Sequence, residues 1–208
     1  MREYHKIQSI YKRDEKTHKF IEDNFSSPEF EYLQNNIWTF TEKIDGTNVR
    51  VYWNHETQEV SFSGRTANAQ IPVFLYDKLN ELFPSDKFKQ FETSLCLYGE
   101  GYGARIQKGG GNYISNGVSF ILFDVLVGDF WLRSAGVEDV ASKLSIDIVP
   151  VIGEGTLHDA IRIVKNGLYS TLGKEDFIAE GLVLRPKVDL FTRMGHRIIT
   201  KVKGKDFV

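Results

Sequence analysis

The chain has 208 residues, of which 41% are hydrophobic and 13% aromatic, so it is long and apolar enough to bury one substantial core. Its 26 basic and 28 acidic residues nearly balance, which excludes attraction of nucleic acid by overall positive charge. A single cysteine excludes an intrachain disulfide, and the histidines lack the spacing of a structural zinc site.

Residues 1–20 are polar and charged, without the apolar centre of a signal peptide. The longest apolar stretch, residues 118–132, contains Asp124 and Asp129 and is too short to span a bilayer. Cys96, between two leucines, is interpreted as a core residue rather than a catalytic thiol. We therefore expect a soluble, intracellular and cytoplasmic protein with no membrane partner.

Residues 1–36 are polar and rich in lysine and arginine, and we expect them to form a basic leader packed on one domain of residues 37–208. Residues 37–43 alternate apolar and polar side chains, which predicts a strand, and Asp45-Gly46 supplies a turn directly after it. Residues 49–53 and 60–62 predict a hairpin around the polar run 54–59.

Further along the chain, apolar spacing predicts helices over residues 71–83 and 134–144, and a third from Thr156, with Asp159 completing a capping pair. Strands are predicted at residues 94–100, 119–127, 182–184 and 197–202, with a long glycine-rich loop over 101–117. Because the elements do not alternate as βαβ units, the predicted fold class is α+β, built on antiparallel sheets.

Lys43-Ile-Asp-Gly-Thr-Asn48 places one lysine at the end of a strand and before a tight polar turn, where its amine can attack phosphorus. Alone, this pattern also fits a surface lysine before an ordinary turn. Further clusters follow in a fixed order, namely Ser63-Gly-Arg65, Leu97-Tyr-Gly-Glu100-Gly-Tyr-Gly-Ala-Arg105, Phe120-Ile-Leu-Phe123-Asp-Val125, Glu180-Gly-Leu-Val-Leu-Arg185 and Lys201-Val-Lys203.

This order resembles the motifs of the covalent nucleotidyltransferases, the superfamily of ATP-dependent DNA and RNA ligases and mRNA capping enzymes. The resemblance extends over residues 38–203. Asn48 and the run Gly99-Glu-Gly-Tyr-Gly103 look most like the phage RNA ligase family. Capping enzymes more often carry an arginine close after the glycine of the lysine motif, whereas this sequence has Thr47-Asn48 there. The resemblance implies an ATP-grasp-like ligase adenylation domain. Because only residues 204–208 follow Lys203, we expect no OB-fold.

The resemblance also implies roles for individual residues. Lys43 would take AMP from ATP as a lysyl-AMP intermediate, and Lys201 and Lys203 would be catalytic cations that face the triphosphate. Glu180 would bind the catalytic Mg²⁺ or Mn²⁺, for which a hard oxygen ligand is suited. The implied nucleotide-binding residues are Glu42, Lys43, Asn48, Arg65, Glu100, Phe123, Glu180, Lys201 and Lys203.

Each of these residues also has a plainer interpretation. Glu180 can be a solvated loop carboxylate, Glu100 a turn residue between glycines, and Phe123 a core residue of its strand. Lys201 and Lys203 can belong to an ordinary edge strand, since alternate residues share a face. The Gly109-Gly-Gly111 run lacks the lysine and serine of a phosphate-binding P-loop, which excludes that motif.

The resulting hypothesis is an ATP-dependent RNA ligase that seals a 5′-phosphate to a 3′-hydroxyl, in RNA repair and in a phage-infected bacterial host. Nucleic acid is the expected partner, with RNA favoured over DNA and a monomer favoured as oligomeric state. The alternatives are a DNA nick ligase, an mRNA-capping-type guanylyltransferase, and a non-catalytic module that binds nucleotide or RNA. The last has no need of a nucleophilic lysine.

Overall fold

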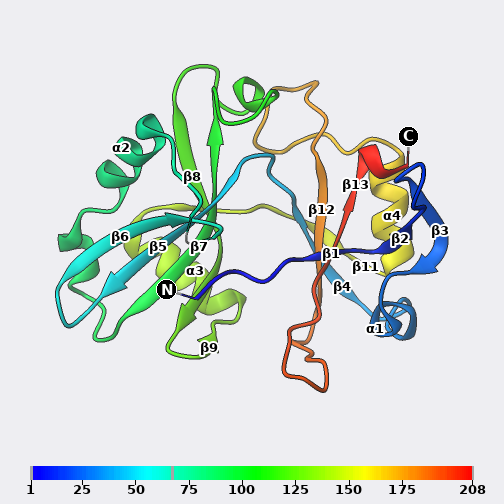
Figure 1. Ribbon diagram of the computed structural model, residues 1–208, viewed down its shortest axis with the longest axis horizontal. Helices are drawn as coiled ribbons and strands as arrows, with labels where there is room; N and C mark the ends of the chain where they lie inside the picture. The colour runs from blue at the N-terminus through cyan, green and yellow to red at the C-terminus, as the bar shows by residue number, and fades with distance from the viewer. Residues whose placement is uncertain (1, 67, 208) are drawn as a thin grey trace. The chain divides into compact units, whose positions relative to one another are not determined.

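The computed structural model describes residues 2–66 and 68–207, so residue 1 of the predicted leader and residues 67 and 208 of the predicted domain lie outside the described residues. The chain divides into two compact units (Figure 1). The first unit contains residues 2–5 and 45–149, and the second contains residues 6–44 and 150–207. The boundary expected after residue 36 stays a prediction.

The first unit is built on a six-stranded sheet with the order β10-β8-β7-β5-β6, in which β9 also pairs with β8. All neighbouring strands are antiparallel except β10 and β8. The strands are β5 (Thr47–Asn54), β6 (Glu59–Gly64), β7 (Leu95–Gly103), β8 (Val118–Val127), β9 (Phe130–Trp131) and β10 (Asp147–Ile148).

The helices α2 (Val73–Leu82) and α3 (Ser134–Leu144) contribute to the core of the first unit, and the short 3-10 helices are η1 (Ser85–Phe88) and η2 (Gly110–Asn112). Leu75 and Leu79 of α2 lie one turn apart and are fully buried. Each such burial stabilises the fold by roughly 1.5–3 kcal/mol. This spacing is the one that predicted the helix.

Two glycines of β7 lie where the core leaves no room for a side chain. A Cβ on Gly99 would lie 2.1 Å from Cζ of Phe120, and one on Gly101 would lie 2.6 Å from Cδ2 of Leu75. Because strand residues alternate between faces, Glu100 points away from this core. The glycine-rich motif therefore lets core side chains pack against its backbone while it presents Glu100 on the other face.

The second unit is built on a five-stranded sheet with the order β1-β13-β12-β4-β11, and β2 and β3 form a separate ribbon. β1 runs parallel to β13, whereas the other pairs are antiparallel. The strands are β1 (Gln8–Ser9), β2 (Tyr11–Arg13), β3 (Phe20–Phe25), β4 (Trp38–Glu42), β11 (Val151–Gly155), β12 (Gly181–Pro186) and β13 (Thr200–Lys203).

The helices of the second unit are α1 (Pro28–Tyr32) and α4 (Leu157–Lys165), followed at the end of the sheet by the 3-10 helix η3 (Gly204–Asp206). Thr156 and Asp159 form the predicted capping box at the start of α4. The helix buries one face in the core of this unit, and it packs against β12 and β13 (Figure 1).

The structure confirms the predicted α+β class with mainly antiparallel sheets, and none of the three sheets of the described residues closes into a barrel. The strand expected over residues 197–202 begins only at Thr200. Residues 6–36 contain three strands and a helix that the sequence did not predict. Cys96 is buried, as expected, and burial raises the pKa of its thiol. None of the described helices is long and apolar enough to cross a membrane.

Candidate active site

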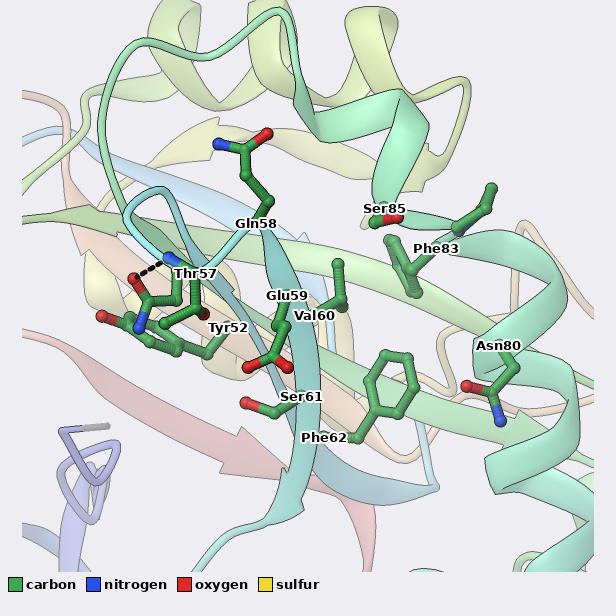
Figure 2. A pocket seen from close by; sticks show the side chains of 12 residues that line it. Tyr52, Thr57, Gln58, Glu59, Val60, Ser61, Phe62, Asn80, Phe83 and Ser85 are labelled. Atoms are coloured by element: carbon green, nitrogen blue, oxygen red, sulfur yellow. Dashed lines mark hydrogen bonds between the residues drawn. The ribbon is translucent and has the colours of Figure 1, made fainter.

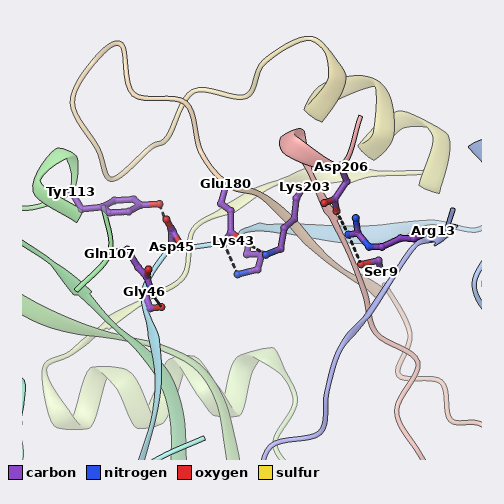
Figure 3. Close-up of polar contacts among 10 residues, drawn as sticks. All are labelled: Ser9, Arg13, Lys43, Asp45, Gly46, Gln107, Tyr113, Glu180, Lys203 and Asp206. Atoms are coloured by element: carbon purple, nitrogen blue, oxygen red, sulfur yellow. Dashed lines mark hydrogen bonds and ion pairs between the residues drawn. The ribbon is translucent and has the colours of Figure 1, made fainter. Parts of the chain in front are cut away.

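Three charged side chains of the second unit meet at the ends of neighbouring strands. Nζ of Lys43 lies 2.6 Å from Oε2 of Glu180, and Nζ of Lys203 donates to Oε1 of the same carboxylate. Figure 3 shows the carboxylate of Glu180 joined to both lysines by dashed lines. The side chains of Lys43, Glu180 and Lys203 are 21%, 13% and 18% exposed, so this charged trio is largely buried but still reached by solvent.

The sheet brings these residues together from remote parts of the chain. β12 pairs with β4 on one side and with β13 on the other, which places Gly181 opposite Lys203. The backbone N–H of Lys43 donates to the carbonyl oxygen of Gly181 at 2.9 Å, directly after β4 ends. Strand pairing alone therefore sets the positions of the lysines on either side of Glu180.

Gly181 explains why glycine follows Glu180. A Cβ at this position would lie 2.0 Å from the carbonyl oxygen of Val202 and 2.8 Å from Cα of Lys203. Real Cβ atoms do not approach backbone atoms this closely. The glycine therefore permits the close pairing of β12 with β13 that holds Glu180 beside Lys203.

The environment of Glu180 keeps its carboxyl group ionised. Burial alone acts to raise the pKa of Glu180, but the charge of Lys43 and the hydrogen bonds from Lys203 and Lys43 outweigh it, so the net pKa is lowered. The carboxylate is consequently negative at neutral pH. An anion between two ammonium groups can both orient the Lys43 amine and accept a cation.

Glu42, which precedes Lys43, is almost fully buried, with 1% exposure. One of its carboxylate oxygens accepts a hydrogen bond from Oγ of Ser170, and the other accepts bonds from the backbone N–H and Oγ1 of Thr171, both at 2.8 Å. These contacts hold the segment that leads to Glu180. The nucleotide-binding role expected for Glu42 stays a prediction.

Lys201 lies on the same face of β13 as Lys203, since the intervening Val202 is buried in the core. Both lysines line a groove of about 610 Å³ in the second unit. The predicted pairing of these lysines on one face is therefore present, and their catalytic role stays a prediction.

The first unit holds the remaining predicted residues. Asn48 of β5 lies directly opposite Glu100 of β7 in the antiparallel register. Within the described chain, the buried Oδ1 of Asn48 has no hydrogen-bond partner. Leaving such an acceptor unsatisfied costs about 1–3 kcal/mol. A ligand that donates a hydrogen bond here would remove that cost.

Phe123 lies at a β-bulge, where the register between β7 and β8 shifts. Its ring is partly exposed and contacts the ring of Tyr4 edge-on, with centroids 5.1 Å apart. Bulges commonly redirect a side chain next to a site. Arg65 is exposed and follows β6 directly. The base-stacking role of Phe123 and the phosphate-binding role of Arg65 stay predictions.

The turn that follows Lys43 is braced by two residues to which the sequence assigned no role. Oη of Tyr113 contacts the backbone nitrogen of Asp45 at 3.2 Å, and Nε2 of Gln107 donates to the carbonyl oxygen of Gly46 at 2.9 Å (Figure 3). Both residues belong to the predicted glycine-rich loop. Their contacts cross more than sixty positions, so no local pattern could reveal them.

A second hollow, of about 470 Å³, lies in the first unit beside β6 and the end of α2. Figure 2 shows polar and aromatic side chains such as Tyr52, Ser61 and Phe62 around it. Glu59 is the single charged residue among its described lining, and none of the predicted site residues contributes. This hollow therefore offers phosphate no positive charge.

The charged trio also bears on metal binding. Among residues 2–66 and 68–207, no group of three or more histidine, cysteine, aspartate and glutamate side chains could enclose a metal. Mg²⁺ in nucleotide sites usually takes one or two carboxylates and completes its shell with water and substrate phosphates. The ionised and partly accessible Glu180 fits that arrangement.

Comparison with known proteins identifies the family. The RNA ligase family model matches residues 36–203. The structure of a Naegleria gruberi RNA ligase with PPi is similar to this one, with a TM-score of 0.67 and 18% sequence identity. The match covers 86% of this chain and 53% of the ligase chain. A variant of that ligase solved with ATP and Mn gives a TM-score of 0.65 and 21% identity over 86% of this chain and 52% of that one.

A further variant, solved with AMP and Mn, gives a TM-score of 0.66 and 18% identity over 86% of this chain and 53% of that one. The chain thus spans about half the length of the solved structures it matches. No curated protein matches the sequence. The structural likeness confirms the fold, and the family match extends from the strand before Lys43 to Lys203, so the chain belongs to the RNA ligase family.

Proposed function

We propose that this protein is an ATP-dependent RNA ligase that transfers AMP from ATP to Lys43 and then joins a 5′-phosphate to a 3′-hydroxyl. The observation that carries the proposal is the contact of Lys43 with an ionised carboxylate that also contacts Lys203. The RNA ligase family match covers all three residues. Solved complexes of a similar ligase with ATP, AMP and Mn support ATP and a divalent metal.

In the first step, the Lys43 nitrogen attacks the α-phosphorus of ATP. An N–P bond forms, the bond from the α-phosphorus to its bridging oxygen breaks, and pyrophosphate leaves with that electron pair. The Lys43 nitrogen must first give a proton to solvent, because a free lysine has a pKa near 10.4 and is protonated at neutral pH. It gives a second proton to solvent as the N–P bond forms. Glu180 orients the nitrogen through the 2.6 Å contact, which restricts its direction of approach.

Lys203 adds a fixed positive charge beside the nucleophile. Such a charge stabilises the negative charge that develops on the phosphate and pyrophosphate oxygens. A bound Mg²⁺ or Mn²⁺, held by Glu180, would neutralise further charge on those oxygens. Lys201 on the same face of β13 is assigned the same electrostatic role.

In the second step, a 5′-phosphate oxygen of the nucleic acid attacks the phosphorus on Lys43, the N–P bond breaks, and the leaving Lys43 nitrogen takes the electron pair of that bond and a proton from solvent. The product carries AMP on the 5′-phosphate. The 3′-hydroxyl then attacks that 5′-phosphorus, loses its proton and expels AMP. Glu100, Asn48 and Phe123 are assigned to the nucleoside, and Arg65 to the phosphate end.

The test incubates the protein with ATP labelled on the α-phosphate and Mg²⁺ or Mn²⁺, followed by a denaturing gel. We expect a covalent band that Lys43→Ala and Lys43→Arg both abolish, because neither variant carries the primary amine there. Lys187→Ala is the matched control, since Lys187 is an exposed lysine of the same unit, ion-paired with Glu154. A band that survives in Lys43→Arg would disprove the assignment of the nucleophile.

Label from GTP instead of ATP would indicate a guanylyltransferase. Folded protein that takes label from neither nucleotide would exclude both enzymes and leave a binding module. The sealing step is checked with nicked RNA, nicked DNA and single-stranded RNA, each with a 5′-phosphate. We expect joined RNA, and joining of nicked DNA alone would contradict the proposed substrate.

A further inference from the structure

The groove beside Lys203 is formed by the two ends of the second unit. One wall comes from residues 6–9, Tyr11, Arg13 and Ser26, and the other comes from β13 and η3; the volume of the groove is about 610 Å³. β1 makes this wall by pairing parallel to β13, with Ser9 opposite Lys201. The segment that carries Lys6 therefore has a fixed position along the sheet.

The lining of the groove is strongly basic. Its charged residues are Lys6, Arg13, Lys201, Lys203, Lys205 and Asp206, so five cations face one acid. Arg13 and the buried Asp206 form an ion pair at 2.7 Å, and Arg13 also donates to the carbonyl oxygen of His18 at 2.9 Å. These two residues serve as a structural clamp between the walls. The excess positive charge comes from the lysines.

Lys6 and Lys205 differ from Lys203 because both are exposed and, within the described chain, have no ion-pair partner. An uncompensated pair of cations in a concave surface attracts phosphates and releases counterions when phosphates bind. Lys203 lines the groove and also contacts Glu180, which contacts Lys43. The groove therefore leads to the candidate nucleophile.

We propose that this groove, with Lys6 and Lys205 as its phosphate contacts, binds the sugar–phosphate backbone of the strand that brings its 5′-phosphate to Lys43. The proposal rests on the ligase function proposed above. A groove of this volume has room for more than one phosphate group. Since lysines act on phosphate as point charges, the contacts would be independent of base sequence.

The test measures binding rather than catalysis. A short single-stranded RNA with a 5′-phosphate and a 3′ fluorophore is titrated with the full chain, without ATP, and anisotropy is read at several salt concentrations. The test variant is K6A/K205A. The control K12A/K174A removes two exposed lysines of the same unit that do not line the groove.

The logarithm of the binding constant falls with the logarithm of the salt concentration, and each phosphate contact on a single strand adds about 0.7 to the steepness of that fall. The double variant loses two contacts, so its slope should be shallower than that of the parent by about 1.4. Its affinity loss should then be about sevenfold larger at roughly 0.05 M salt than at roughly 0.2 M. K6R/K205R should retain the slope of the parent. Circular dichroism on all variants checks that the fold is intact.

Equal slopes in K6A/K205A and K12A/K174A would overturn the proposal. An equal loss of affinity for ATP would also overturn it, because the groove would then hold the triphosphate of the nucleotide rather than the nucleic acid backbone. Because the binding assay contains no ATP, it measures RNA binding independently of the transfer of AMP to Lys43. A chain that takes no AMP but binds RNA through these lysines would refute the ligase function alone.

Discussion

Replacement of Glu42 separates a structural role from the predicted contact with nucleotide. In the Glu42→Ala variant, Oγ of Ser170 loses its acceptor in a site with 9% exposure. Leaving a buried hydroxyl unsatisfied costs about 1–3 kcal/mol. Thr171 is exposed, so water can replace its bonds to Glu42 and they add little. The expected loss is about 2 kcal/mol, or a fall in Tm of roughly 4–8 °C for a chain of this size.

Glu154→Ala is the matched control for this variant. Glu154 is also a glutamate of the five-stranded sheet, but its ion pair with Lys187 is between side chains that are 42% and 58% exposed. Such pairs contribute about 0–1 kcal/mol. Thermal unfolding followed by circular dichroism, together with the KM for ATP, gives both readouts. If Glu42→Ala unfolds at the same temperature as Glu154→Ala and only the KM rises, the structural reasoning is refuted.

Two further variants test the charged trio and the glycine-rich motif. The pKa of Glu180 is lowered in the folded protein, so the stability that its ionised form contributes is present at neutral pH and is lost as the pH falls through the folded pKa. In Glu180→Gln, the free energy of unfolding should therefore fall less steeply with acidification than in the parent. A parent and a variant with the same acid profile would contradict the ion-pair assignment. Gly99→Ala should cost about 1–3 kcal/mol, because its Cβ would collide with Phe120, whereas Gly111→Ala, with open space around it, should cost little. Equal denaturant midpoints for the two alanine variants would show that the collision relaxes freely.

The local pattern of the sequence predicted much of the fold. Alternation found β4 and the hairpin of β5 and β6, and helical spacing found α2, α3 and α4. The turn after Lys43 was visible because Asp45-Gly46 is a strong local signal. These elements depend on residues that are close together in the chain.

The missing elements depend on remote partners. β1 has two residues, and it becomes a strand only because β13, far along the chain, provides a parallel neighbour. The neighbours Ile198 and Ile199 are both buried, so the segment before Thr200 does not alternate between buried and exposed side chains as a strand with one exposed face does. The backbone N–H of Ile198 bonds to Leu190 instead of extending β13. The alternation of apolar and polar residues along a strand does not show which remote backbone group accepts a hydrogen bond.

The candidate site was predicted in part for the same reason. The motif order assigned Lys43, Glu180 and Lys203 through the family resemblance, and the sheet places these three in contact. Ser170, which bonds to Glu42, carries no sequence signal, since serine is common in loops. The sequence predicted the residues whose chemical type the proposed reaction requires. It did not predict the residues that hold them in place through hydrogen bonds.

The charge of the trio indicates which ligand completes it. Two ammonium groups and one carboxylate leave one net positive charge, and Lys201 on the same face of β13 adds to it. A bare divalent cation at Glu180 would therefore be repelled by two lysines. The repulsion energy between two unit charges 4 Å apart near a protein surface is about 4 kcal/mol. A polyphosphate supplies the missing negative charge and shares the cation's oxygen ligands. The electrostatics of these residues consequently favour a metal that arrives with its nucleotide over a metal that is bound beforehand.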